Sequence, residues 1–292
     1  THFEITKSFL TEGFNVLCEK PLTMTVKEAR QLVKLAKAKG KICAVNYGYT
    51  GYPLVRQMRS MVLNGDLGDL RVVFAEFAGG FMADSSDSDN PRVKWRFTAK
   101  HAGMAAITID CGIHALNMAC FVTNKKIVKV SSDFFSGIKS RELEDDNLSS
   151  FRMEDDVAGR LWTSGLAIGR THGLTLQVFG SKGGLSWKQE QPNQLFWTPL
   201  NDSTRIIERG HSSLYPSAKR INKITIGHPE GMIAAFSNIY KDLFDNIYAR
   251  KFGNNPIELS NSYPTVEDGC HSLEIVKAMK KSISLNGSWA RV

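Results

Sequence analysis

The feature that most constrains the fold is a strand, a helix and a second strand that follow one another near the start of the chain. Residues 15–18 and 42–45 are short and mostly apolar. Between them, Thr25 and Glu28 have the spacing of a capping box at a helix start, and Gly40 is typical of a helix end. A strand–helix–strand unit of about 30 residues is one step of a parallel sheet. We therefore expect a parallel α/β layer in this part of the chain.

Polar residues stand where each of these strands ends. Glu19-Lys20-Pro21 follows the first strand directly, and Asn46 follows the second. Ligands of open parallel sheets bind outside the carboxyl ends of the strands. Lys20 is therefore a candidate for chemistry, although taken alone it is better interpreted as a solvated lysine before a proline turn.

After these strands the chain continues as helices and many short β-type runs. Apolar residues at three- and four-residue steps predict helices at 53–63, 231–250 and 265–284. Strands are predicted at 70–77, 127–135, 156–163, 174–179, 184–188 and 194–198. Because the last four runs follow one another with little helix between them, we expect a mainly antiparallel sheet. Residues 82–91 are expected to form a mobile loop, and 201–223 a long irregular excursion over the surface.

The segment 108–118 predicts a short helix with one polar face. Asp110 and His114 lie one turn apart on this face, and Gly112 between them indicates that another group approaches the backbone closely. An ionised carboxylate can fix the tautomer of an imidazole and raise its basicity. A surface ion pair is the alternative interpretation. A metal site that includes His101 is disfavoured, because no further ligand follows at a suitable spacing.

Composition argues against several classes of function. At 292 residues the chain is long enough for two lobes. Its net charge is +8, but Lys and Arg are spread along the sequence, which favours a solvated basic surface over nucleic-acid binding. No apolar run is long enough to cross a membrane. The five cysteines are scattered and form no CxxC pair, so free thiols in a reducing cytoplasm are expected.

Six short motifs follow one another along the chain. They are Leu17-Cys18-Glu19-Lys20-Pro21-Leu22, the Gly-Asp-Leu-Gly turn at 65–68, Trp95-Arg96, Asp110-Cys111-Gly112-Ile113-His114, and the segments 180–184 and 263–269. In this order and spacing, the chain resembles the Gfo/Idh/MocA family of nicotinamide-dependent sugar and cyclitol oxidoreductases. The resemblance extends from Thr1 to the C-terminus.

The resemblance implies a fold and a division into domains. The implied fold class is α/β plus α+β: a truncated Rossmann-type parallel βαβ remnant, followed by a large open, mainly antiparallel β-sheet domain with packing helices. Residues 1–46 would be the remnant of a dinucleotide-binding domain, and 47–292 the substrate-binding and oligomerisation domain, with the C-terminal helix packing back on the remnant. Since a bare sheet face would aggregate, we expect a homodimer or homotetramer through that face.

Carried over by residue, the resemblance places catalysis on Lys20, Asp110 and His114, which we expect to converge on one small cavity. Oxidation of a carbinol by hydride loss leaves a proton on the oxygen, so a base and a cation must lie beside it. His114 would be the base and Lys20 the hydrogen-bonding cation, or the two could share the proton. Asp110 would orient His114 or bind a substrate hydroxyl. The implied cofactor is NAD or NADP. Residues expected to contact it or to line its cleft are Glu19, Lys20, Pro21, Asn46, Trp95 and Arg96.

The sequence departs from the family pattern in two places. It contains no GxGxxG motif, the glycine-rich turn that holds a pyrophosphate. It also has Tyr47-Gly48-Tyr49 where many members carry an arginine. Because the chain starts at Thr1 and not at methionine, we expect an N-terminally truncated chain that lacks about 100 residues, at about 25 for each missing strand and helix, and whose nucleotide binding is impaired. The alternative is a non-catalytic sugar-binding or oligomerisation module.

Overall fold

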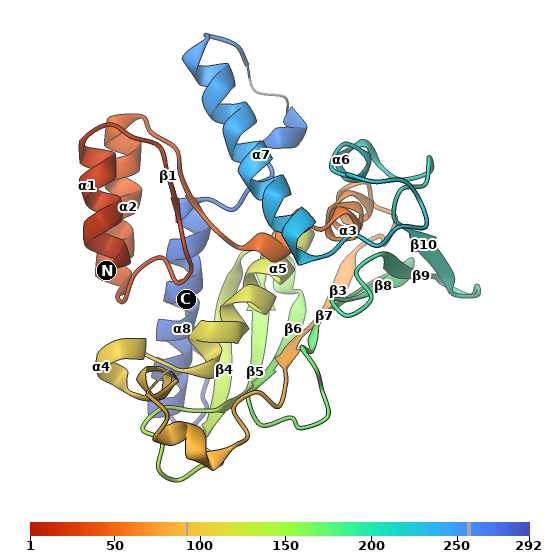
Figure 1. Ribbon diagram of the computed structural model, residues 1–292. Helices are drawn as coiled ribbons and strands as arrows, with labels where there is room; N and C mark the ends of the chain where they lie inside the picture. Colours follow the sequence, from red (N-terminus) through yellow and green to blue (C-terminus); the bar gives the residue numbers. More distant parts are fainter. Residues whose placement is uncertain (92, 256–257) are drawn as a thin grey trace.

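The structure is a computed structural model that describes residues 1–91, 93–255 and 258–292 (Figure 1). The helices are α1 (His2–Thr11), α2 (Val26–Lys39), α3 (Pro53–Leu63), α4 (Ala99–Ala102), α5 (Ile113–Thr123), α6 (Pro216–Lys219), α7 (Met232–Lys251) and α8 (Val266–Ser284). Short 3-10 turns are η1 (Gly48–Gly51), η2 (Ser85–Ser88), η3 (Lys94–Phe97), η5 (Glu154–Asp156) and η6 (Glu258–Ser260). One turn, η4 (Thr108–Gly112), is π-helical.

The strand–helix–strand step predicted near the N-terminus is confirmed. Strands β1 (Val16–Cys18) and β2 (Cys43–Val45) form a parallel pair in which Val16 lies opposite Cys43. The Thr25 side chain accepts from the Glu28 backbone N–H and the Glu28 carboxylate accepts from the Thr25 N–H, which completes the predicted capping box of α2. Gly40 ends α2 with a φ of +60°, a left-handed conformation that glycine adopts without strain.

The rest of the strands form one nine-stranded sheet. The strands are β3 (Leu70–Ala78), β4 (Ile127–Phe135), β5 (Asp146–Met153), β6 (Ala158–Ser164), β7 (Leu174–Gly180), β8 (Gly183–Lys188), β9 (Gln194–Pro199), β10 (Arg205–Glu208) and β11 (Ala290–Arg291). Their order across the sheet is β10-β9-β8-β7-β3-β6-β5-β4-β11. Only the β3–β6 pair is parallel among these neighbours. The predicted mainly antiparallel sheet is therefore confirmed.

Three of these strands, β5, β10 and β11, were not predicted. In β5 the inward positions begin with the polar residues Asn147 and Ser149, while the apolar Leu148 points outward and is 56% exposed. Polar residues therefore point inward and an apolar residue points outward, which is the reverse of the pattern by which a half-buried strand is recognised in a sequence. The edge strand β10 has no fully buried residue, and only its Ile207 is partly buried against the core. The expectation of an irregular excursion over 201–223 is wrong, because β10 and α6 lie there, and the loop predicted over 82–91 includes η2.

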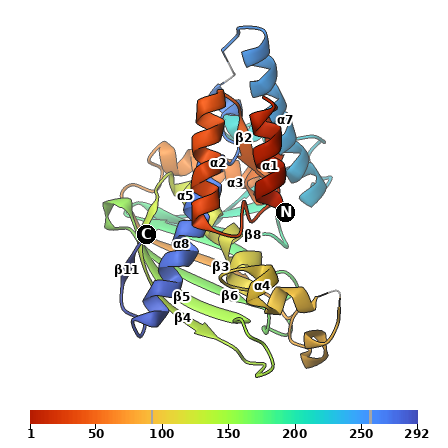
Figure 2. The same ribbon diagram turned by 90° about the vertical axis from the view of Figure 1, so that its left-hand side faces the viewer.

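Helices cover one face of the large sheet (Figure 2). Side chains of α3, α5 and α8 join the inward residues of the strands in the largest apolar cluster, which includes Met58, Leu116, Val130, Phe151 and Trp187. The opposite face presents Val72, Leu148 and Phe179, which are exposed. One side of the sheet is therefore a conventional core, and the other is an accessible surface with apolar residues.

The two long C-terminal helices return to the N-terminal strands. α8 packs against α2 and β2 in a second apolar cluster that contains Val26, Leu32, Val45 and Val276. α7 contributes Leu243 to a third cluster with Ile42 and Ala44. The carboxyl ends of β1 and β2 are thus enclosed by segments that lie far away in the sequence.

Candidate active site

Lys20 lies directly after the carboxyl end of β1, and its ammonium contacts a residue 90 positions away. Its Nζ donates to Asp110 Oδ1 at 2.8 Å and to the Asp110 carbonyl oxygen at 2.5 Å. The side chain of Lys20 is only 18% exposed. The chain therefore brings together Lys20 and Asp110, two of the three predicted catalytic residues, in direct contact.

Asp110 has a second cationic partner in Arg96. The Arg96 Nε donates to Asp110 Oδ2 at 3.3 Å, and its guanidinium lies 4.7 Å from the centroid of the Trp95 ring. Burial opposes ionisation of Asp110, but the charge and hydrogen bond of Lys20, followed by those of Arg96, lower its pKa below the usual range of an aspartate. Lys20, Asp110 and Arg96, which we call the polar cluster, thus hold an ionised carboxylate between two cations.

The helix predicted over 108–118 is divided into the π-helical turn η4, which carries Asp110, and α5. A Cβ on Gly112 would lie 3.1 Å from Thr163 Cγ2, so the close approach expected at this glycine exists, but its partner is strand β6. A π turn has wider hydrogen-bond spacing than an α turn, and it lies between the expected helix start and His114. Among the residues that the structure describes, the Asp110 side chain bonds to Lys20 and Arg96, and the expected contact with His114 is not formed.

His114, at the start of α5, lies in a cage of aromatic rings. The ring centroids of Tyr49, Tyr47 and Phe77 are 4.8, 5.6 and 6.1 Å from that of the imidazole. We call these three residues the aromatic cage. His114 is 7% exposed, and its Nδ1 has no hydrogen-bond partner in the described part of the chain. Burial, and then the charge of Lys20, hold the pKa of His114 well below its usual range, so the ring is neutral at neutral pH.

A second histidine contacts the aromatic cage. The Tyr49 hydroxyl lies 3.0 Å from His172 Nε2, and the His172 ring is 4.6 Å from that of Phe77. Burial lowers the pKa of His172 as well. Sequence reasoning noted Tyr49 only as a departure from a family pattern and missed His172. His172 lies between β6 and β7, where no local pattern marks it.

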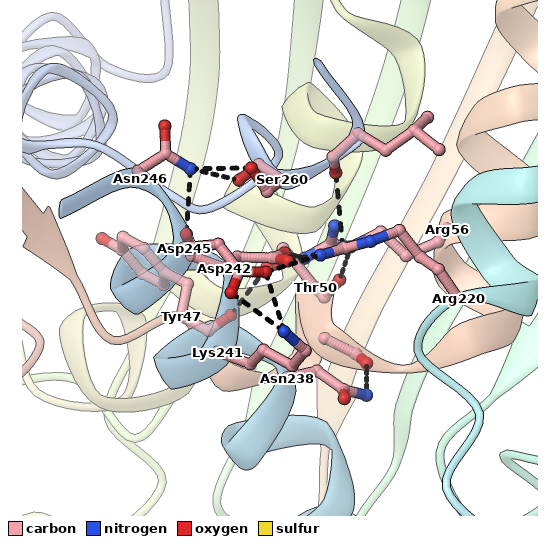
Figure 3. A network of polar contacts seen from close by, with 12 residues as sticks. Tyr47, Thr50, Arg56, Arg220, Asn238, Lys241, Asp242, Asp245, Asn246 and Ser260 are labelled. Atoms are coloured by element: carbon pink, nitrogen blue, oxygen red, sulfur yellow. Dashed lines mark hydrogen bonds and ion pairs between the residues drawn. The ribbon is translucent and has the colours of Figure 1, made fainter. Parts of the chain in front are cut away.

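A buried polar network supports the turn that carries the cage tyrosines (Figure 3). Arg56 donates through Nε to the Thr50 carbonyl at 2.7 Å and through Nη2 to Asp242 Oδ2 at 2.8 Å. Both side chains of this ion pair are fully buried. Asn238 donates to the Gly51 carbonyl at 3.0 Å. Helices α3 and α7 thus hold η1, and with it one side of the aromatic cage.

A cleft of about 450 Å³ opens beside the polar cluster. The predicted site residues that line it are Lys20, Pro21, Trp95, Arg96 and Asp110. His114, Glu19 and Asn46 do not line it. The expectation that Lys20 and His114 share one small cavity is therefore wrong for this cleft. His114 lies in the aromatic cage, near enough to Lys20 for the ammonium charge to contribute to its lowered pKa.

The strand ends also hold an unpaired hydrogen-bond acceptor. Asn46 Nδ2 donates to Glu19 Oε1 at 2.6 Å, and the Asn46 backbone N–H donates to the Cys18 carbonyl at 2.8 Å. Asn46 Oδ1 is buried and has no partner among the described residues. An orphan acceptor at the carboxyl ends of parallel strands fits the amide or hydroxyl donors of a nicotinamide riboside.

Two other kinds of site were tested. Within residues 1–91, 93–255 and 258–292, no three His, Cys, Asp or Glu side chains are placed to hold a metal ion, so the alternative metal site at His101, Asp110 and His114 is not formed. No described helix has both the length and the apolarity needed to cross a bilayer.

Comparison with known proteins places the chain in a family. Residues 1–47 match the model of the oxidoreductase family with an NAD-binding Rossmann fold, and residues 55–186 match the GFO/IDH/MocA C-terminal domain. The oxidoreductase YfiI of Bacillus subtilis is 30% identical over 292 residues, which is 99% of this chain and 74% of YfiI. Levoglucosan dehydrogenase of Pseudarthrobacter phenanthrenivorans is 22% identical over 216 residues, covering 66% of this chain and 54% of that protein.

A solved structure matches along the whole chain. An inositol dehydrogenase homologue from Azotobacter vinelandii, complexed with NAD⁺, superposes with a TM-score of 0.93 and 33% identity, covering 100% of this chain and 76% of the homologue. The same homologue complexed with NADH and myo-inositol superposes with a TM-score of 0.90. The chain thus belongs to the Gfo/Idh/MocA family of oxidoreductases.

Proposed function

We propose that this protein oxidises a CH–OH group of a sugar or cyclitol, with NAD as the hydride acceptor. The observation that carries the proposal is the Lys20 ammonium held by the Asp110 carboxylate beside a cleft at the carboxyl end of β1. Membership of an NAD-binding oxidoreductase family supports the reaction class. The Azotobacter homologue, crystallised with NADH and myo-inositol, supports the class of substrate.

The cofactor supplies an acceptor for the hydride when it is bound. Asn46 Oδ1, buried and unpaired, and the Glu19 side chain that orients Asn46 would hold the nicotinamide end. Pro21 and Trp95, which line the cleft, would limit the access of water to the reacting carbon.

Lys20 is suited to stabilise the substrate oxygen. An ammonium has three N–H donors. Two of those on Lys20 are directed to the carboxylate and carbonyl of Asp110, which leaves the third for a substrate hydroxyl or the alkoxide that develops from it. Asp110 therefore orients Lys20, a different role from the one first expected, in which it orients His114.

His114 does not line the cleft, but the charge of Lys20 acts on it, and we assign to it the role of accepting the hydroxyl proton of a substrate held at Lys20. The lowered pKa keeps its ring neutral, which is the form that accepts a proton. The aromatic cage disfavours a lasting imidazolium, so the proton would return to solvent after each turnover. The neighbouring His172, hydrogen-bonded to the Tyr49 hydroxyl, is half-buried.

The test is a steady-state assay of NADH formation over a panel of sugars and inositols, with sugar binding measured separately by calorimetry. Lys20→Met should lower kcat by about 10²- to 10³-fold, as removal of one donor to a developing oxyanion does elsewhere. Lys7→Met, at an exposed lysine on α1, is the control and should leave kcat unchanged. Absence of turnover with every polyol, in a protein shown by calorimetry to bind NADH, would refute the proposal. Polyol binding without nucleotide binding or turnover would support the non-catalytic sugar-binding module instead.

We also propose that the open face of the nine-stranded sheet joins copies of the chain into a homodimer or homotetramer. The exposed apolar side chains Val72, Leu148 and Phe179 on that face support this assignment. Leu148→Glu should shift the mass measured by light scattering towards the monomer. A monodisperse monomer in the unmodified protein would contradict it.

A further inference from the structure

The loop between β4 and β5 contacts each of three segments that line the cleft. The Arg141 guanidinium lies 4.0 Å from the centroid of the Phe97 ring in η3. The Glu142 carboxylate accepts from the Ala99 N–H at the start of α4 at 3.0 Å. Glu144, two residues further on, contacts the start of the segment that carries Asp110. The loop thus contacts η3, the start of α4 and the start of the segment that carries Asp110.

Glu144 makes the closest set of these contacts. Its Oε1 accepts from the backbone N–H groups of Ala106 and Thr108, both at 3.0 Å, and its Oε2 lies 3.0 Å from the same Ala106 N–H. Its own carbonyl accepts from the Ile107 N–H at 3.4 Å. Glu144 therefore accepts hydrogen bonds from the three successive backbone N–H groups of residues 106–108, which would otherwise lack partners at a helix start.

We propose that Glu144 is a positioning residue that acts through Asp110. Glu144 is 5% exposed, so its carboxylate has few alternative partners. The Asp110 backbone N–H donates to the Ala106 carbonyl oxygen at 2.9 Å. Ala106 is one of the residues whose backbone N–H groups donate to Glu144. At the other end of the turn, Gly112 lies against Thr163 of β6. The turn is therefore clamped at both ends, and the clamp directs the Asp110 carboxylate at Lys20.

The reason for this device lies in the π-helical turn. A π turn is less favourable than an α turn, and it persists where the surrounding structure determines it. An anionic side chain at a helix N-terminus interacts favourably with the exposed N–H groups and the helix dipole. Loss of the Glu144 charge would let η4 relax towards α-helical spacing. The Asp110 carboxylate would then turn away from Lys20 and Arg96.

The chain offers a matched control in Glu230. Glu230 is also 5% exposed and also accepts two backbone N–H groups, from Lys223 at 2.6 Å and Ile224 at 3.0 Å. It does not line the cleft beside the polar cluster. Glu230 also forms a buried ion pair with Arg209 at 2.8 Å, so Glu230→Gln should destabilise the fold at least as much as Glu144→Gln. An effect on Asp110 that only Glu144→Gln produces therefore reports on position and not on general destabilisation.

The experiment measures the pKa of Asp110 by carboxyl ¹³C NMR in the full chain. We expect Glu144→Gln to raise that pKa from its lowered value towards that of an ordinary aspartate, and Glu230→Gln to leave it unchanged. Glu144→Asp, which keeps the charge on a shorter side chain, should give a smaller rise and serves if the glutamine variant does not fold. A folded Glu144 variant with the wild-type pKa of Asp110 would overturn the proposal.

A kinetic measurement gives a second test, which rests on the proposed function. Glu144→Gln should lower kcat by up to about 10²-fold, because Asp110 and Lys20 would lose their alignment. KM for the polyol should change little. In a double-mutant cycle, Glu144→Gln should have little further effect in the Asp110→Asn background, and additive losses would contradict action through Asp110. If the wild-type protein has no turnover, the proposed function fails. The pKa measurement still decides the role of Glu144.

Discussion

The polar cluster and the aromatic cage are neighbouring groups of residues that affect charge in opposite ways. In the polar cluster, Asp110 stays ionised because Lys20 and Arg96 surround it, and its pKa falls. In the aromatic cage, His114 is denied both water and a hydrogen-bond partner for Nδ1, and its pKa falls because the charged form is disfavoured. The same direction of shift therefore keeps one group charged and the other neutral. A cation for an alkoxide and a base for a proton require this division.

Removal of the proposed base, His114, should have the largest effect on kcat. A small effect would contradict the contrast between the aromatic cage and the polar cluster. His114→Ala should lower kcat by about 10²- to 10⁴-fold, the usual contribution of a general base. His101→Ala is the control, since His101 lines the cleft but lies outside the aromatic cage. Equal losses in the two variants, measured by NADH formation, would show that the cage confers no special role on its histidine.

The support of the cage can be tested through the buried ion pair. Asp242→Asn leaves the Arg56 guanidinium buried without its full counter-charge, and we expect it to lower the free energy of unfolding by about 3–5 kcal/mol. Asp245→Asn is the matched control, because Asp245 pairs with Arg220 and Lys241 nearer the surface and should contribute about 0–1 kcal/mol. Urea unfolding measures both values. Similar losses would mean that the buried pair does not stabilise the turn beneath the cage.

The neutral state of His114 predicts a pH dependence. Because its pKa is lowered by burial, the ring loses its accepting form only when the pH falls through a value below the ordinary histidine pKa of about 6.5. The acid limb of kcat/KM should therefore lie below that pH. The same depressed pKa makes folding stability decrease as the pH falls below about 6.5, since the unfolded chain then binds the extra proton. Tyr49→Ser should admit water and move the acid limb upwards, and an unmoved limb would argue against the cage as the cause.

The smallest effect is expected from the Tyr49 hydroxyl alone. Tyr49→Phe keeps the ring against His114 but removes the hydrogen bond to His172, at a stability loss of about 0.5–1.5 kcal/mol. The acid limb of kcat/KM should stay where it is in the wild-type protein. Comparison of Tyr49→Phe with Tyr49→Ser thus separates the ring, which excludes water, from the hydroxyl, which holds His172.

Local sequence patterns were sufficient for much of the scaffold. The capping box that begins α2 and the glycine that ends it are short-range features, and the structure contains both. The position of Lys20 after a buried strand follows from the same local reasoning. The order of the motifs was sufficient for the family. Patterns failed where the inward residues of a strand are polar, as in β5, or where a strand has no fully buried residue, as in β10.

The site itself was only partly predictable. The types and positions of Lys20, Asp110 and His114 could be read from the sequence, but the partners of Asp110 could not, because Lys20 lies 90 positions away and Arg96 lies in a separate turn. Glu144 binds the backbone N–H groups of Ala106 and Thr108 from a loop between two other strands, and no local pattern indicates this contact either. Phe77 contacts His114 from β3, while His172 contacts Phe77 and Tyr49 from the loop between β6 and β7. Nothing in their local sequences indicates these contacts.

By itself, the sequence determined the strand–helix–strand unit, the antiparallel sheet, the family and the residue types available for acid–base chemistry. These depend on periodicity, capping and turn residues that act over a few positions. Only the tertiary structure decided which residues contact Lys20, why His114 stays neutral and which carboxylate binds the backbone N–H groups at the start of η4. Hydrogen bonds, charge interactions and loss of water act through space, and here they join residues that are tens of positions apart in the chain.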